Sequence, residues 1–369
     1  MSEHTTPQTE AHAGQHVDLS PAQSGAAVSI RSLSHAYNRP KPRPGKHTAP
    51  TPAYQLDPAL NDISLDIHPG EVFGLLGPNA SGKSTLLRIL ATVQAQRPPS
   101  GTTPGTAHIF GLDVATQPAL VRQQLGVVFQ HAGLDDKLSA RENLRFHGML
   151  YGLNGRDLNT RCGHWLQSLG LADRAGDLIG SFSGGMRRRV EIAKALLPGP
   201  RLLMMDEAST GLDAAVLREI WDLLRERVDQ DGLTIALTTH LMHEAEQCDR
   251  LAVLSKGRII AIDSPAGLVG RVGGQVLEVQ LAGDRFENTP TEQQAVEDVI
   301  ARLAPQPAPA IQWIGGCGRV EHNDVAQWVG PVLSELGEQA RSVRVGRPTL
   351  EDAYLKLTGH RLGGEAQDH

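Results

Sequence analysis

The sequence has little cysteine. Its 369 residues include three, Cys162, Cys248 and Cys317, which lie far apart along the chain. A secreted domain held together by disulfide bonds would carry several cysteines at short spacing. The chain is therefore expected to fold in a reducing compartment.

Long apolar runs are also lacking. A helix that crosses a bilayer needs about 18 to 20 consecutive apolar residues, and no window of the sequence approaches this. The N-terminal residues 1–27 are mostly polar and contain no apolar core of a signal peptide. We predict a disordered polar tail here, and expect that any membrane span would come from another chain.

The chain has no excess of positive charge. It has 35 Lys and Arg residues against 41 Asp and Glu, which gives a formal net charge of -6. Such a balance provides no general attraction to nucleic acid, so no nucleic-acid partner is expected. The 40% hydrophobic and 21% charged residues are typical of a globular protein, and the length allows two or three domains.

The central part of the chain, 28–272, shows the pattern of an α/β fold. Short apolar segments predicted as strands alternate with amphipathic segments predicted as helices, namely 71–76 with 83–93, 201–205 with 213–228, and 233–239 with 241–248. This alternation favours a parallel sheet covered by helices. Residues 38–58 contain six prolines, so we predict an exposed, irregular insertion there.

Two further units are predicted around this sheet. A more helical block, 131–197, interrupts the strand pattern and is expected to form an inserted helical subdomain. After Gly273 and Gly274, the segment 275–369 is expected to form a C-terminal accessory domain. Its pattern is strand 275–281, helix 291–303, strands 310–315 and 318–323, helix 324–336 and strand 341–345, which is typical of a small α+β domain of the ferredoxin-like type.

A phosphate-binding loop is the strongest motif. It satisfies G-x-x-x-x-G-K-[ST] between a predicted strand and a predicted helix, and consists of Gly77, Pro78, Asn79, Ala80, Ser81, Gly82, Lys83, Ser84 and Thr85. Backbone N–H groups at a helix N-terminus bind phosphate, Lys83 is placed to reach the β- and γ-phosphates, and the Ser84 hydroxyl to bind Mg²⁺. A glycine-rich turn that matched this motif by chance would not need to lie between a predicted strand and a predicted helix, so we favour a phosphate-binding loop.

A second motif complements the loop. The apolar strand 202–205 ends in Asp206 and Glu207, and parallel sheets bind ligands at the carboxyl ends of their strands. Successive side chains point in different directions, so Asp206 is predicted to hold Mg²⁺ and Glu207 to polarise the water that attacks the γ-phosphate. These motifs alone allow any P-loop ATPase or GTPase, including a small-molecule kinase.

Further motifs carry a family resemblance. Ser183, Gly184 and Gly185 open a basic helix shortly before the strand with Asp206 and Glu207, which resembles the signature sequence of ABC ATPases. The other motifs of that family are in the family's order. They are Gln130, which ends the predicted strand 126–130, Ser209 to Asp213 as the D-loop, and His240 as the switch histidine, and Tyr37 lies where the family has an aromatic residue that stacks on adenine. The resemblance covers residues 28–268.

The resemblance implies a division of labour between two copies of the chain. Ser183, Gly184 and Gly185 would face the ATP held by the opposite subunit, so that a homodimer encloses two nucleotides. Gln130 would bind Mg²⁺ and sense the attacking water, while His240 would hold the γ-phosphate and orient Glu207. The family also implies a separate permease in the membrane that contacts the transported compound, and a location on the cytoplasmic side of that membrane.

Two segments narrow the subfamily. Residues 186–189, Met-Arg-Arg-Arg, and residues 348–359 are similar to the drug-resistance exporters of the daunorubicin type and their nodulation-type relatives. The arginines could equally form a solvated face, and the terminal segment could simply be a helix that packs on its own domain. The implied function is an ATPase subunit of an exporter; the alternative is a soluble ABC-type ATPase without a transport role.

Overall fold

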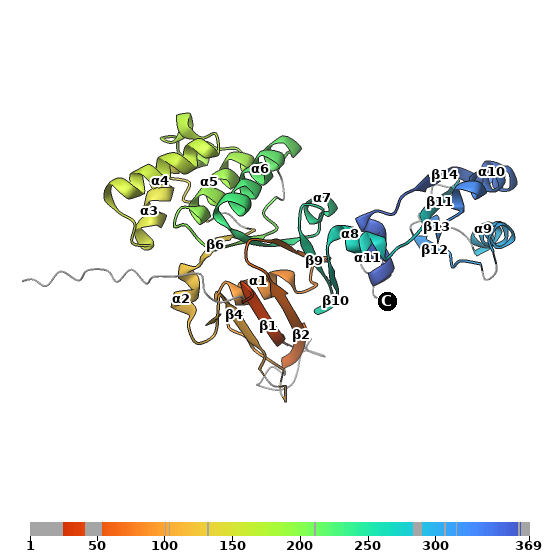
Figure 1. Cartoon of the computed structure of the whole chain (residues 1–369), viewed down its shortest axis with the longest axis horizontal. Coiled ribbons are helices and arrows are strands. Elements are labelled where there is room, and N and C mark those ends of the chain that lie inside the picture. The colour runs from red at the N-terminus through yellow and green to blue at the C-terminus, as the bar shows by residue number, and fades with distance from the viewer. Residues whose placement is uncertain are drawn as a thin grey trace, which may run out of the picture.

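The computed structural model describes residues 25–40, 54–99, 101–102, 104–130, 133–209, 212–282, 290–305, 308–314, 316–360 and 362. Most of the predicted tail, the middle of the proline-rich insertion, and Thr210 and Gly211 of the D-loop lie outside these residues. Within them, no helix combines the length and the apolar character needed to cross a membrane. Figure 1 shows three strand-containing regions and a cluster of helices.

A six-stranded sheet forms the centre of the protein, in the order β10-β9-β3-β8-β7-β6. Five strands are parallel, namely β3 (Val72–Leu76), β6 (Leu125–Val128), β7 (Leu202–Asp206), β8 (Thr234–Thr239) and β9 (Arg250–Ser255). β10 (Arg258–Asp263) pairs antiparallel with β9 at one edge. Because β3, β7 and β8 are adjacent and parallel, the loops that follow them meet at one edge of the sheet.

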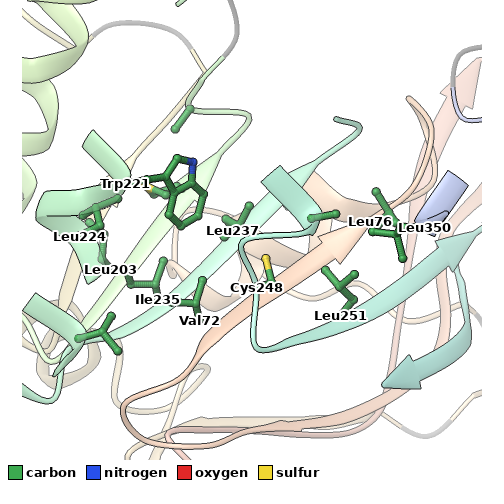
Figure 2. Packing of buried hydrophobic residues seen from close by; sticks show 14 of the residues in the cluster. Val72, Leu76, Leu203, Trp221, Leu224, Ile235, Leu237, Cys248, Leu251 and Leu350 are labelled. Atoms are coloured by element: carbon green, nitrogen blue, oxygen red, sulfur yellow. The ribbon is translucent and has the colours of Figure 1, made fainter. Parts of the chain in front are cut away.

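Helices cover both faces of this sheet, as the alternating pattern predicts. They are α1 (Lys83–Leu90), α2 (Pro118–Gln123), α6 (Ala214–Asp231), α7 (Met242–Ala245) and α8 (Pro265–Gly270). On one face, Trp221 and Leu224 of α6 pack against Leu203, Ile235 and Leu237 of the strands (Figure 2). The apolar side of α6 is thus part of the core and carries no chemistry.

A second, antiparallel sheet has the order β2-β1-β4-β5. Its strands are β1 (Val28–Pro40), β2 (Tyr54–Ile67), β4 (Thr106–Ile109) and β5 (Leu112–Asp113). The prediction of an irregular segment over 38–58 is wrong at both ends, since Asn38 pairs with Leu56 and Pro40 with Tyr54. Proline is tolerated at a strand end because it removes only one donor there. Residues 41–53 lie outside the described part of the chain.

Three helices lie between β6 and β7 in the chain and cluster beyond one end of the large sheet (Figure 1). They are α3 (Ala140–Leu150), α4 (Gly155–Ser168) and α5 (Gly184–Leu196). Leu144, Leu158, Cys162, Leu166 and Val190 form a buried apolar core of their own among them. A capping box between Ser139 and Glu142 fixes the start of α3.

The C-terminal part contains β11 (Gln275–Leu281), α9 (Pro290–Leu303), β12 (Gln312–Ile314), β13 (Cys317–His322), α10 (Val325–Leu336) and β14 (Ala340–Gly346). Its strands form an antiparallel sheet in the order β12-β13-β11-β14. The last helix, α11 (Leu350–Thr358), packs against α8 and β10. Its Leu350 and Tyr354 join the core of the large sheet, while its Asp352 and Lys356 pair with Arg319 and Glu321 of β13. The helix therefore packs on both parts of the chain.

Candidate functional site

The phosphate loop, residues 77–85, links β3 to α1 and needs glycine at specific positions. Gly82 precedes α1 with φ 103°, in the left-handed region that L-residues avoid. A Cβ atom on Gly82 would lie 2.5 Å from the carbonyl oxygen of Ala59, and one on Gly77 would lie 2.4 Å from that of Leu254. Ala80 has φ 61°, so its backbone is strained at a position where glycine would be relaxed.

The loop lines a cavity of about 250 Å³ together with Gln130 and Glu207. Lys83 is buried, and its Nζ donates to the carbonyl oxygens of Gly77 at 2.8 Å and Pro78 at 2.9 Å. Burial lowers the pKa of Lys83, although Glu207 and Asp206 oppose this. The hydroxyl of Ser81 is buried without a hydrogen-bond partner in the described residues. The cavity therefore offers donors for an anion such as a triphosphate.

Asp206 lies at the end of β7 and is 1% exposed. Its Oδ1 accepts hydrogen bonds from Ser84 Oγ at 2.8 Å and Thr238 Oγ1 at 2.7 Å. Its Oδ2 is buried and has no hydrogen-bond partner among the described residues. A carboxylate with one free oxygen beside a serine hydroxyl is the type of oxygen ligand set that suits Mg²⁺, so these residues fit that ion.

Glu207 points in a different direction from Asp206, as predicted, but it lies beyond the end of β7 with φ 48°, so strand alternation is not the cause. Its Oε1 lies 3.7 Å from Lys83 Nζ and 3.4 Å from His240 Nδ1, and its Oε2 accepts from Gln130 Nε2 at 3.3 Å. The contact with His240 is not an aligned hydrogen bond, because His240 Nδ1 has no hydrogen-bond partner in the part of the chain that the structure describes. The structure thus brings Glu207, His240 and Gln130 together beside the phosphate loop.

Gln130 is not where a metal ligand alone would be expected. It follows β6 by two residues, and its side-chain amide contacts Glu207. The hydrogen bonds to Asp206 come instead from Ser84 and Thr238. The three predicted metal-binding residues are therefore not all in contact with one another. Ser84 contacts Asp206, whereas Gln130 contacts Glu207.

Tyr37 lies next to the phosphate loop. Its hydroxyl is 3.2 Å from Thr85 Oγ1 and also contacts the amide of Gln94. The ring packs edge to face on His35 with centroids 4.8 Å apart and is 37% exposed. An exposed aromatic ring at this place is compatible with stacking on a nucleotide base.

The predicted signature residues do not line this cavity. Ser183 caps α5 by accepting a hydrogen bond from Met186 N, and Gly185 packs near Val216 of α6. Asp213 caps α6 by accepting from Ala215 N and Val216 N. One chain therefore presents a phosphate cradle and, separately, the N-termini of two helices whose backbone N–H groups can bind an anion.

Sequence reasoning missed some residues of the site. Thr238, which shares Asp206 with Ser84, was predicted only as part of a strand. Arg188 was grouped with its two neighbours as a charge run, but it is 7% exposed and contacts the backbone around Glu207. No local pattern distinguishes these two residues, because their partners lie far away in sequence.

Comparisons with known proteins agree with this geometry. A family model described as ABC transporter matches residues 60–210. Daunorubicin resistance ATP-binding protein DrrA2 of Streptomyces coeruleorubidus is 37% identical over 306 residues, covering 82% of this chain and 91% of the relative. Nod factor export ATP-binding protein I of Rhizobium meliloti is 36% identical over 317 residues, covering 85% of this chain and 87% of the relative.

A solved structure supports the same conclusion. The ATP-binding cassette MJ0796, in a dimeric post-hydrolysis state bound to ADP and Pi, matches with a TM-score of 0.54 at 26% identity, over 64% of this chain and 98% of that structure. Similarity to transporter subunits over more than four fifths of the chain does not favour the soluble ATPase without a transport role. The chain belongs to the ABC transporter family, as an ATP-binding and ATP-hydrolysing subunit of an exporter.

Proposed function

We propose that two copies of this chain enclose two molecules of ATP, each nucleotide lying between the phosphate loop of one copy and the Ser183-Gly184-Gly185 turn of the other. The observation that carries this proposal is the composition of the phosphate-loop cavity. It contains the loop, Gln130 and Glu207, but the turn at the start of α5 does not line it. The dimeric state of the related cassette MJ0796 supports the same arrangement.

Within each half-site the described contacts suggest a role for each side chain. Lys83 can exchange its two carbonyl partners for β- and γ-phosphate oxygens, and Tyr37 can stack on the adenine. Glu207 accepts a proton from the attacking water, and His240, 3.4 Å away, orients Glu207 and holds the γ-phosphate. Asp213 lies at the start of α6, close to the second copy's nucleotide.

Mg²⁺ would be held by Ser84, Asp206 and Gln130. The buried Oδ2 of Asp206, which has no partner among the described residues, supports this role for Asp206 and for Ser84 beside it, whereas Gln130 would have to turn from Glu207 to join them. When bound, the ion neutralises charge on the β- and γ-phosphate oxygens. Thr238 keeps the Asp206 carboxylate oriented through its 2.7 Å hydrogen bond.

Hydrolysis would drive transport through a separate permease in the membrane, with the chain on the cytoplasmic face. The end of α3 offers an apolar surface for docking, since Phe146 is 55% and Leu150 83% exposed. By analogy with the relatives that are named for daunorubicin resistance and Nod factor export, the cargo is a hydrophobic or amphipathic compound that contacts the permease. Loss of the γ-phosphate contacts would reopen the dimer and reset the permease.

The domain boundaries follow the same proposal. Residues 28–272 form the cassette, with 131–197 as its inserted helical subdomain and 275–369 as a ferredoxin-like accessory domain. The order β12-β13-β11-β14, with α9 and α10 packed on Leu277 and Val279 of one sheet face, supports the ferredoxin-like assignment.

The experiment compares Glu207→Gln with the double variant Glu207→Gln, Ser183→Arg. With ATP and Mg²⁺, the single variant is expected to hydrolyse at a rate about 10² to 10⁴ times lower, because it lacks a general base, and to elute as a dimer in size-exclusion chromatography. The double variant is expected to bind ATP but stay monomeric. A single variant that remains monomeric even with its permease present contradicts the shared site.

A further inference from the structure

One arginine of the signature helix is buried beneath the site. Arg188 of α5 is 7% exposed, whereas its neighbours pair at the surface, Arg187 with Asp136 and Arg189 with Glu219. Arg188 also pairs with Glu191 at 2.6 Å, and Glu191 is 6% exposed. A buried charge needs such partners, so this position is specified by contacts inside the protein.

The guanidinium of Arg188 binds the backbone of two different loops. It donates to the carbonyl oxygen of Phe129 at 2.8 Å, to that of Glu207 at 3.4 Å, and to that of Ala208. Phe129 directly precedes Gln130, whose side chain donates to Glu207 across the cavity. A single side chain therefore holds the backbone beside both residues that face the phosphate loop.

The same face of α5 holds the far side of Gln130 as well. Glu191, three residues after Arg188, accepts from the backbone N–H of Gly133 at 2.9 Å. Lys194, a further three residues on, donates to the carbonyl oxygen of Gly133 at 2.6 Å. Residues at this spacing share one helix face. One face of α5 therefore forms hydrogen bonds with the backbone on both sides of Gln130, at Phe129 and at Gly133.

The backbone at Glu207 requires such support. Glu207 has φ 48°, a left-handed conformation that is unfavourable for a residue with a Cβ and persists where its surroundings impose it. Arginine suits this place because its planar fork has five N–H donors, whereas lysine offers a compact ammonium that cannot reach all of these acceptors at once.

We propose that Arg188 is a positioning residue for ATP hydrolysis, which ties the placement of α5 to the placement of Glu207 and Gln130 in the same chain. The N-terminus of α5 carries the Ser183-Gly184-Gly185 turn. Engagement of that turn by the second copy's nucleotide is thereby transmitted to the two side chains that act on the first copy's own nucleotide. This inference rests on the proposed role of Glu207 and adds a link between the two half-sites.

The test compares Arg188→Lys with Arg187→Lys in the full chain together with its permease. Both variants keep the positive charge, and the second makes the same change on the neighbouring arginine, which is only partly buried. For Arg188→Lys we expect kcat for ATP hydrolysis to fall at least tenfold while KM and the affinity for ATP stay within about twofold, since the phosphate loop is untouched. Arg187→Lys is expected to keep the wild-type kcat.

Two further measurements separate the possible failures. The first is the stoichiometry of ATP binding, which corrects kcat for any misfolded fraction. The second is kcat of the double variant Arg188→Met, Glu191→Leu, which removes the buried ion pair without leaving an unpaired carboxylate. A wild-type kcat in both Arg188 variants, with Glu207→Gln inactive, overturns this inference and leaves the proposed function intact. A wild-type rate in Glu207→Gln overturns the proposed function itself. A loss of ATP affinity equal to the loss of kcat would show that Arg188 only stabilises the fold.

Discussion

Glu244 makes the stability of this protein depend on pH near neutrality. It lies in α7, is 4% exposed, and accepts a hydrogen bond from the hydroxyl of Thr239, which in turn accepts one from Leu241 N. The pKa of Glu244 is raised from 4.5 to about 7, mainly by burial and also by the charge of Glu207, with the Thr239 hydrogen bond and Arg188 acting against the rise. The folded protein therefore retains a proton that the unfolded chain has lost.

The size and sign of the effect follow from this difference. At about 1.36 kcal/mol for each pH unit, a rise from 4.5 to about 7 amounts to about 3 kcal/mol. Because the folded-state pKa is raised, this stability is fully present below pH 4.5 and is lost as the pH rises to about 7. Glu244→Gln keeps an acceptor for Thr239 and cannot ionise, so it should escape that loss.

The assay is urea unfolding of wild type and Glu244→Gln at pH 5, 6, 7 and 8. We expect the variant to be more stable than wild type by only about 1 kcal/mol at pH 5, and this difference to grow to about 3 kcal/mol at pH 8. Glu246→Gln, an exposed acid of the same segment, serves as the control and should show little divergence. A difference between Glu244→Gln and wild type that is constant across the pH range would refute the reasoning.

Two further predictions concern stability elsewhere. Gly82→Ala should abolish ATP binding and lower the melting temperature, since the new Cβ would lie 2.5 Å from the carbonyl oxygen of Ala59. The control is Gly111→Ala, where φ is 80° but no atom is near the new Cβ, and its free energy of unfolding should fall by only about 1 to 2 kcal/mol. Arg319→Met should lower the free energy of unfolding by about 3 to 5 kcal/mol because it leaves the buried Asp352 unpaired. The double variant Arg319→Met, Asp352→Asn should recover part of this loss in urea unfolding, and no recovery would contradict the ion-pair explanation.

Much of the site could be predicted from local sequence. The phosphate loop is set by residues close together in the chain, because Gly82 supplies a left-handed backbone and α1 begins directly after it. Asp206 ends a fully buried strand and Glu207 directly follows it, so local sequence predicted that both acids lie at this edge of the sheet. The direction of the Glu207 side chain depends on its left-handed backbone, with φ 48°, which the alternation of a strand does not predict. The one-sided apolar pattern of α6 likewise predicted its buried face.

Contacts between distant residues could not be predicted in this way. Thr238 and Asp206 meet because β7 and β8 are neighbours in the sheet, and nothing in either strand alone encodes that. Packing on its own domain was one interpretation of the terminal helix α11, yet its Leu350 joins the core of the large sheet. The apolar face of a helix predicts that this face will be buried, but it does not predict which element will cover it.

The sequence by itself determined the phosphate-loop motif and the acids at the end of β7, since motif residues at short spacing impose their own backbone conformation. Only the tertiary structure decided which charged residues serve that site. The buried Arg188 and the partly exposed Arg187 are adjacent and identical in type. The physical reason for their different positions is that α5 turns one toward the carbonyl oxygens of Phe129 and Ala208 and the other toward solvent.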